Sequence, residues 1–137
     1  MSIIYHKESL FERDLEYQDD PMTHCVSQDL KMGAGIALVF RQRYGVPSKS
    51  ADIGKFVIHA GNYHLVTKSK YFNKPTMQSL TNCLNNMKKH ALENNVERIH
   101  MPCIGCGLDR LNWAMVEAAL EEIFGDTEIE LHVYLNI

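Results

Sequence analysis

Short apolar runs alternate along this chain with longer segments whose apolar residues recur every three or four positions. The clearest helical segment starts at Pro75-Thr76 and ends at Asn94-Asn95. Its one-sided apolar stripe consists of Met77, Leu80, Leu84, Met87 and Ala91. Strands alternating with helices predict an α/β fold in which helices cover both faces of a mixed sheet. The length of 137 residues suits a single domain with a substantial core, spanning residues 1–137.

The remaining elements are predicted from composition and spacing. The expected strands are residues 3–5, 22–27, 56–60, 63–67, 96–102 and 129–135. Gly61-Asn62 predicts a two-residue hairpin turn, because both residues tolerate positive φ. A helix is expected from about Ala34 to Tyr44 and another after Asn112, while residues 12–20 are acidic and irregular. In the final strand, alternation predicts that Ile129, Leu131, Val133 and Leu135 share one buried face.

Two glycine loops follow predicted buried strands. Gly33-Ala34-Gly35 opens a helix, and Gly105-Cys106-Gly107 precedes Asp109. Backbone N–H groups of such loops can approach a phosphate closely, and ligands gather at the carboxyl ends of parallel strands. Neither loop is a dinucleotide or P-loop fingerprint. The alternative for each is a tight turn, with Asp109 or Asn112 as a helix cap.

Lys68 ends a predicted strand and is the candidate nucleophile. A lysine at a strand end is usually a solvated charge, and it attacks carbon only when deprotonated, which burial or nearby cations promote. Asp109 can react, orient another group or cap a helix. The seven histidines are expected to be structural, with His24 buried and bonded to the backbone.

Composition excludes several classes of protein. The net charge of −3 provides no global basic field, so stable nucleic-acid binding is not expected. No apolar run approaches the roughly 20 residues of a membrane span, and the first residues contain no signal-like apolar region. Disulfides would be awkward at Cys25, Cys103 and Cys106, which favours a reducing, cytoplasmic location, or the nucleus in a eukaryote. Cys103-x-x-Cys106 lacks a second ligand pair, so we expect no metal and no cofactor.

The order of several motifs resembles the macrodomains, closest to the branch of terminal ADP-ribose protein glycohydrolases and DNA ADP-ribosyl antitoxins. The matching blocks run across nearly the whole chain: His24-Cys25-Val26-Ser27, residues 32–37, Leu65-Val66-Thr67-Lys68, Lys74-Pro75-Thr76, Met101-Pro102, residues 104–111, Trp113 and Val133-Tyr134.

The resemblance implies a three-layer α/β/α macrodomain that binds ADP-ribose as a monomer and acts on ADP-ribosylated protein or DNA. In that branch, the lysine at the position of Lys68 forms a covalent lysyl-ADP-ribose intermediate, which the aspartate at the position of Asp109 resolves. The resemblance also implies the residues that contact ADP-ribose: Ser9, Leu10, Ser27, Met32, Gly33, Ala34, Gly35, Ile36, Thr67, Ile104, Gly105, Cys106, Gly107, Leu108 and Tyr134.

One position departs from the family. Where relatives have an aspartate that accepts a hydrogen bond from the adenine amino group, this chain has Ser9, which accepts without a charge. The segment between Arg43 and Lys55 is also short, which predicts a more open pocket. The same pocket would suit two alternatives, a phosphatase acting on ADP-ribose 1″-phosphate and a non-catalytic reader of ADP-ribose.

Overall fold

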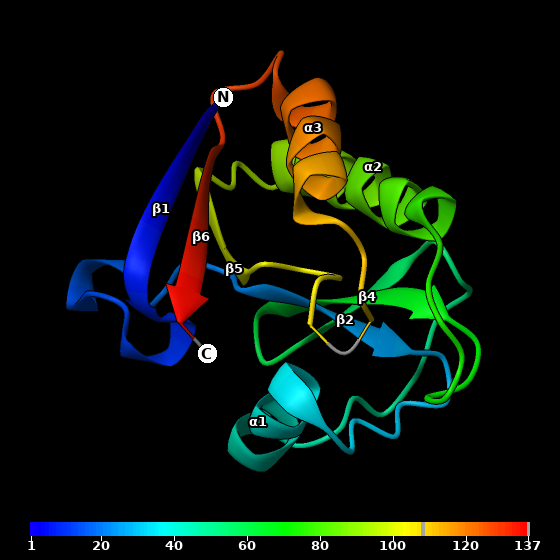
Figure 1. Ribbon diagram of the computed structural model, residues 1–137. Coiled ribbons are helices and arrows are strands. Elements are labelled where there is room, and N and C mark those ends of the chain that lie inside the picture. The colour runs from blue at the N-terminus through cyan, green and yellow to red at the C-terminus, as the bar shows by residue number, and fades with distance from the viewer. Residues whose placement is uncertain (108, 137) are drawn as a thin grey trace.

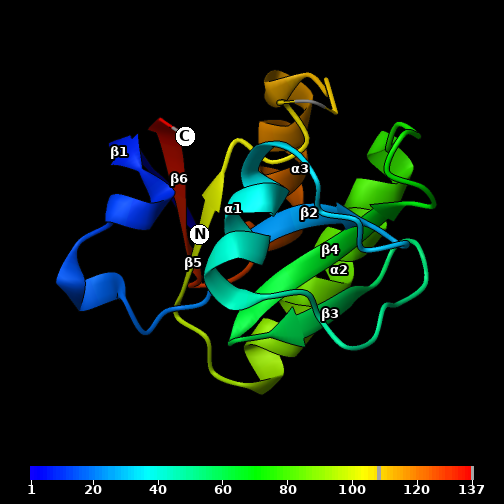
Figure 2. The same ribbon diagram turned by 90° about the horizontal axis from the view of Figure 1, so that it is seen from below.

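The computed structural model describes residues 1–107 and 109–136 and has three layers (Figure 1). Two three-stranded sheets lie edge to edge, in the orders β1-β6-β5 and β2-β4-β3. They meet at a parallel bridge between Met22 and His100. Helices α2 and α3 cover one face and α1 covers the other, as the view from below in Figure 2 also shows. The predicted α/β/α architecture with a mixed sheet is confirmed.

The strands and helices have these bounds: β1 Ser2–Ser9, β2 Thr23–Ser27, α1 Gly35–Tyr44, β3 Phe56–His59, β4 Asn62–Lys68, α2 Met77–Glu93, β5 Arg98–Pro102, α3 Trp113–Phe124 and β6 Glu130–Asn136. Short 3-10 turns occupy Leu10–Glu12 and Leu15–Tyr17, within or beside the segment predicted to be irregular. Strand β3 is antiparallel to β4, whereas the other strand pairs are parallel. No helix among the described residues is long and apolar enough to cross a membrane.

Two clusters of buried side chains hold the layers together. The larger lies beneath α2 and α3 and includes the predicted stripe residues Leu80, Leu84 and Met87, all fully buried. The smaller packs Phe40 of α1 against Val66 of β4. Helix α2 therefore forms where its amphipathic stripe predicts, because that stripe faces the sheet.

Three local predictions were wrong. The hairpin turn is Ala60-Gly61, with φ values of 52° and 76°, and Asn62 instead begins β4. Asn62 is displaced from the turn because its side-chain oxygen accepts a hydrogen bond from the Met22 N–H at 3.0 Å. Strand β1 extends to Ser9, well beyond the predicted residues 3–5, because it pairs with β6.

The third error concerns β6 at the centre of its sheet. Residues 131–134 are all buried because helices or loops cover both faces, so apolar alternation does not mark one inner face. Leu135, predicted to be in the core, is 53% exposed. His24 also differs from expectation: its Nε2 lies 2.7 Å from His64 Nδ1 rather than against the backbone.

Candidate active site

The candidate nucleophile and its acidic partner are in direct contact. The Nζ of Lys68, at the end of β4, donates a hydrogen bond to Asp109 Oδ1 at 2.7 Å. The two side chains are only 15% and 16% exposed. Asp109 does not cap α3, because the Asn112 side chain does so by accepting from Ala114 N–H at 2.8 Å. The carboxylate is therefore free of a helix-capping role and faces the amine instead.

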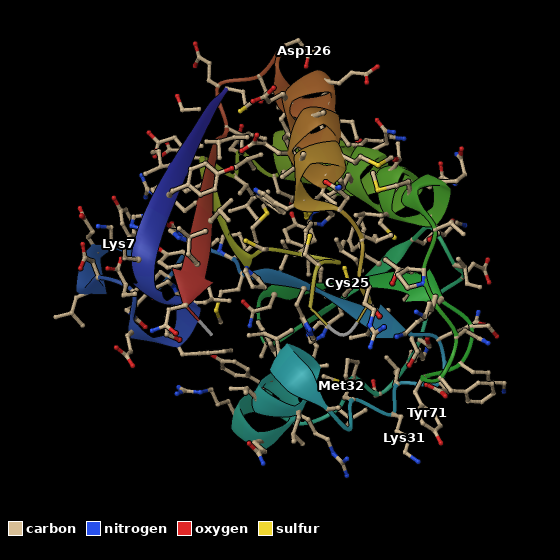
Figure 3. All side chains as sticks on the ribbon, viewed as in Figure 1. Lys7, Cys25, Lys31, Met32, Tyr71 and Asp126 are labelled. Carbon is tan, nitrogen blue, oxygen red and sulfur yellow. The ribbon has the colours of Figure 1, made fainter. Side chains whose placement is uncertain are left out.

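The parallel strands bring the predicted loops together. Strands β2 and β4 end side by side, with Ser27 opposite Lys68 after a register shift that follows Val26, and β5 ends at Pro102. The loops that follow these strands thus emerge at one edge of the sheet, where α/β folds collect their ligands. Cys25 of β2 and Met32 of the following loop, both labelled in Figure 3, line a cavity at this edge.

A cavity of about 640 Å³ lies at this edge, within the usual range for a small-molecule site. Eleven of the seventeen predicted site residues line it: Ser27, Met32, Gly33, Ala34, Gly35, Ile36, Lys68, Ile104, Gly105, Gly107 and Asp109. Both glycine loops and the Lys68–Asp109 pair therefore share one crevice, as their positions after predicted strands indicated.

The glycines of these two loops lack a side chain for different structural reasons. Gly105 has φ of 74°, and an added Cβ would lie 2.8 Å from Leu111 Cδ1. The fold itself thus excludes a side chain there. Gly107 has no heavy atom of the described residues within 4 Å of an added Cβ, and Gly33 meets only Lys31 at 3.6 Å or more. Their lack of a side chain instead leaves open space in front of the backbone.

The start of α1 is electrostatically suited to an anion. Residues Gly35, Ile36 and Ala37 line the cavity, and no side chain of the N-cap residue Ala34 satisfies their N–H groups. The first turn of α1 also contains no acidic residue. By contrast, a capping box closes the start of α2 and Asn112 caps α3. Uncapped N–H groups and the helix dipole favour negative charge at this end of the cavity.

Sequence reasoning missed one side of the cavity. Its further lining residues are Cys25, Val26, Lys31, Ala37, Tyr71, Phe72, Asn73, Lys74, Pro102 and Cys103. Tyr71, Phe72, Asn73 and Lys74 belong to the loop between β4 and α2. The sequence signals nearest to them were the position of this loop directly after Lys68 and the matching block Lys74-Pro75-Thr76. A polar loop of this length has no periodicity that would reveal which of its side chains face a ligand.

Five predicted ligand residues lie outside the lining of this cavity in the described structure: Ser9, Leu10, Thr67, Cys106 and Tyr134. Leu108 lies outside the described residues. Ser9 Oγ accepts from Phe11 N–H at 3.3 Å, and Leu10 is 1% exposed. The Tyr134 hydroxyl lies 2.8 Å from His100 Nδ1. Their contacts with ADP-ribose remain predictions.

The thiols around the site are not activated. Burial raises the pKa of Cys106 to about 11, and the neighbouring Cys103 thiol adds to the rise. Burial likewise raises the pKa of Cys25 well above its usual value. All four cysteines are free thiols. Thiols with raised pKa values remain protonated near neutral pH, which argues against a cysteine nucleophile at this site.

Residues 46–120 of the chain match the family model described as Macro domain. The chain is 39% identical over 145 residues to proteins named ADP-ribose glycohydrolase OARD1 from Bos taurus and Homo sapiens. Each alignment covers 96% of this chain and 90% of the relative. The solved macrodomain of Thermus aquaticus DarG superposes with a TM-score of 0.82 at 19% identity, covering 97% of each chain.

The three layers and the glycine-lined crevice at the sheet edge define an α/β/α domain with a candidate ligand site. The match to the family model and the 39% identity to the relatives identify which family this domain belongs to. The chain belongs to the macrodomain family.

Proposed function

We propose that this macrodomain is an ADP-ribosyl hydrolase that releases ADP-ribose from modified protein or DNA through a covalent lysyl intermediate. The observation that carries the proposal is the 2.7 Å contact between Lys68 Nζ and Asp109 Oδ1 inside the cavity. The printed activity of the 39% identical relatives, ADP-ribose glycohydrolase, supports the same class of reaction.

The reaction proceeds in two steps at the distal ribose. Lys68 Nζ attacks the anomeric carbon, so that an N–C bond forms while the bond to the leaving oxygen or nitrogen breaks. The leaving group keeps the electron pair, and the Asp109 carboxylate accepts the proton released from Nζ. Water then attacks the same carbon, so that a C–O bond forms while the lysyl C–N bond breaks and its electron pair returns to Nζ. Nζ takes up one proton, and the products are ADP-ribose and the free lysine amine.

The rest of ADP-ribose would occupy the glycine loops. The diphosphate is a good match for the uncapped N–H groups at the start of α1. Open space in front of Gly33 and Gly107 allows phosphate or ribose oxygens to approach the backbone closely. Ser27, Met32, Ile36 and Ile104 complete the wall against which these groups pack.

A substrate panel tests the proposal. Release of ADP-ribose is measured from a glutamate-linked peptide and from a thymidine-linked oligonucleotide, with the wild type, Lys68→Ala and Lys7→Ala. Lys7 is an exposed lysine on β1, far from the cavity in Figure 3, so it controls for loss of one surface cation. We expect release by the wild type and Lys7→Ala only, and full activity in Lys68→Ala would exclude the covalent mechanism.

Two alternative activities are separated in the same assay. Phosphate release from ADP-ribose 1″-phosphate, without ADP-ribose release from either linked substrate, would make the protein a phosphatase. Tight binding of ADP-ribose in calorimetry without turnover of any substrate would make it a reader. The Lys68–Asp109 pair favours the hydrolase, because a reader requires neither an amine nor a carboxylate at that place.

We propose further that residues 1–137 form one domain that works as a monomer in a reducing, cytoplasmic environment. The free thiols Cys25, Cys83, Cys103 and Cys106 support the choice of environment. Gel filtration with light scattering should give a mass close to 15.7 kDa. A mass near twice that value would contradict the monomer.

A further inference from the structure

The two strands that lead to the proposed nucleophile end irregularly. Val26 of β2 pairs with Val66 of β4, but the next residue, Ser27, pairs with Lys68. Thr67 is therefore an extra residue of β4, directly before the proposed nucleophile. A bulge of this kind changes the direction of the side chains that follow it, and bulges are common beside active sites. The direction of the Lys68 side chain thus depends on how the two strand ends are held together.

The loop after β2 continues this irregularity. Leu30 and Met32 have positive φ values of 53° and 48°, which residues with a Cβ rarely adopt. Met32 is buried and lines the cavity, and Gly33 of the first glycine loop follows it. Left-handed backbone at residues other than glycine persists where the surroundings enforce it, and such positions cluster at functional sites. Contacts around this loop must therefore hold it in its conformation.

The side chain of Asp29 supplies contacts of this kind. Its Oδ1 accepts a hydrogen bond from the Ser27 hydroxyl and another, at 3.2 Å, from the Lys31 N–H, which fixes the turn that leads to the glycines. Its Oδ2 accepts a hydrogen bond from the Tyr71 N–H at 3.1 Å, on the loop after β4. We call these three hydrogen bonds the Asp29 clamp. One carboxylate thus joins the first glycine loop to the segment that follows the proposed nucleophile.

Other contacts join the same two loops. The Gln28 N–H donates a hydrogen bond to the Lys68 carbonyl at 2.8 Å. Lys31 Nζ lies 4.3 Å from the centroid of the Tyr71 ring, and Figure 3 shows the two side chains adjacent at the edge of the molecule. Backbone pairing thus sets the loops side by side, and the Asp29 clamp fixes their spacing.

The charge and the location of Asp29 suit a residue that positions others. Desolvation alone would raise the pKa of Asp29, but its three hydrogen bonds and the nearby Lys70 hold its pKa below the usual value. An ionised carboxylate only accepts hydrogen bonds, which matches its three donors. Asp29 is exposed and is not among the described residues that line the cavity. Its substitution therefore leaves the core and the cavity wall in place.

We propose that Asp29 is a positioning residue that sets the Lys68 amine at attacking distance from a ligand held by the first glycine loop. This inference rests on the proposed hydrolase function and adds a residue to its machinery. The start of α1 holds the diphosphate, and the Asp29 clamp fixes the loop spacing that brings the anomeric carbon to Nζ. Reacting atoms must lie about 3–3.5 Å apart, and a misplacement of about 1 Å can lower the rate about 100-fold.

The substitution Asp29→Asn tests this role because it breaks only one half of the clamp. The amide oxygen still accepts from Ser27 and Lys31, whereas the amide nitrogen, which only donates, faces the Tyr71 N–H. We expect kcat for ADP-ribose release to fall roughly 10-fold to 100-fold. The Kd of free ADP-ribose and the midpoint of thermal unfolding should stay unchanged, because the glycine turn and the core remain intact.

Two further variants complete the comparison. Asp29→Ala breaks both halves of the clamp, so kcat should fall at least as far and the Kd of ADP-ribose should also rise about 2-fold to 10-fold. Asp52→Asn is the matched control, since it removes the same charge from an exposed aspartate that lies 4.0 Å from Lys55 and outside the described cavity lining. It should leave both kcat and Kd unchanged.

Several results would overturn the inference. An unchanged kcat in Asp29→Asn would do so, as would an equal fall in Asp52→Asn, because the effect would then come from charge rather than position. Weaker ADP-ribose binding or a lower unfolding midpoint in Asp29→Asn would assign Asp29 to the ligand site or to the fold as a whole. Unchanged binding by Asp29→Ala would remove the link to the glycine loop.

Failure of the proposed function is recognised separately. If the wild type releases ADP-ribose from neither linked substrate, the hydrolase proposal is wrong. The position of the Lys68 amine is then measured by acetylation with limiting acetic anhydride, with the exposed Lys7 as internal reference. In Asp29→Asn the ratio of Lys68 to Lys7 acetylation should rise about 2-fold to 5-fold, since the amine loses its contact with Asp109. An unchanged ratio would overturn the positioning role.

Discussion

The two ends of the predicted ADP-ribose site use their polar groups in opposite ways. At the ribose end, Lys68 and Asp109 contact each other inside an open cavity. At the predicted adenine end, Ser9 caps a 3-10 turn and Tyr134 is 1% exposed. Lys68 and Asp109 thus contact each other at the cavity, whereas Ser9 and Tyr134 are engaged within the fold.

The hydrogen bonds of the closed end form a chain through the core. His100 Nε2 lies 2.9 Å from Asp20 Oδ2, and Nδ1 lies 2.8 Å from the Tyr134 hydroxyl. Since a carboxylate only accepts, His100 donates a hydrogen bond from Nε2 to Asp20. Its Nδ1 then accepts a hydrogen bond from the Tyr134 hydroxyl. Tyr134 thus has a structural role, and any contact with adenine must leave its hydrogen bond to His100 intact.

The largest expected effect is at the open end. Asp109→Ala removes the proposed acceptor of the lysine proton, so kcat for ADP-ribose release should fall by about 10² to 10⁴. Mass spectrometry of the reacting variant should detect ADP-ribose attached to Lys68, because resolution of the intermediate is slowed. Asp126→Ala is the matched control, since Asp126 also contacts a lysine, Lys88, at 2.8 Å but lies away from the cavity (Figure 3). Comparable losses in both variants would contradict a specific role for Asp109.

The next effect concerns stability at the closed end. Burial lowers the pKa of His100 to about 4, although the Asp20 hydrogen bond opposes the shift. Between pH 6.5 and pH 4 the unfolded chain therefore binds a proton that native His100 does not, and stability falls as pH falls. We expect His100 to contribute about 2 kcal/mol to this loss, allowing for screening, with a further loss from His64, whose pKa burial also lowers to about 4.

Denaturant unfolding at pH 7 and pH 4.5 measures this loss. Lys68→Ala should show the same pH dependence as the wild type, because the substitution leaves His100 and His64 in place. A stability that is constant over this interval would contradict buried, neutral histidines.

A smaller effect separates the two kinds of glycine. Gly105→Ala forces a side chain into positive φ and against Leu111, so the free energy of unfolding should fall by about 1–3 kcal/mol. Gly107→Ala has open space within the protein and should change stability by less than about 0.5 kcal/mol. It should instead weaken ADP-ribose binding about tenfold, by blocking close approach of the ligand. Chemical denaturation and calorimetry distinguish the variants, and unchanged affinity in Gly107→Ala would exclude a ligand at that glycine.

The smallest effect is predicted at Ser9. Ser9→Asp keeps the N-cap acceptor and adds a charge, so ADP-ribose affinity should rise about fivefold if adenine reaches this position. Ser9→Asn provides a neutral control of similar size. Equal ADP-ribose affinities of the wild type, Ser9→Asp and Ser9→Asn would show that adenine does not contact this cap. Ser9 would then serve only the fold, in contrast to the residues of the ribose end.

The sequence predicted the parts of the fold that depend on local periodicity. The α2 stripe and the α3 cap at Asn112 were placed correctly, because burying one helix face and satisfying N–H groups are local requirements. The hairpin turn was misplaced by one residue, because the hydrogen bond from Met22 to Asn62 joins segments forty positions apart. The alternation in β6 failed because cover on both faces depends on how the layers assemble.

The sequence by itself determined the alternating elements, the two glycine loops and the candidates Lys68 and Asp109. Only the tertiary structure decided that the amine meets the carboxylate, because their contact spans 41 positions and requires the ends of parallel strands to share one edge. The structure also decided that Gly105 serves packing while Gly107 leaves space. Finally, it placed Tyr71 and Phe72 at the cavity mouth, since the backbone bonds that hold their loop come from Asp29 on another segment.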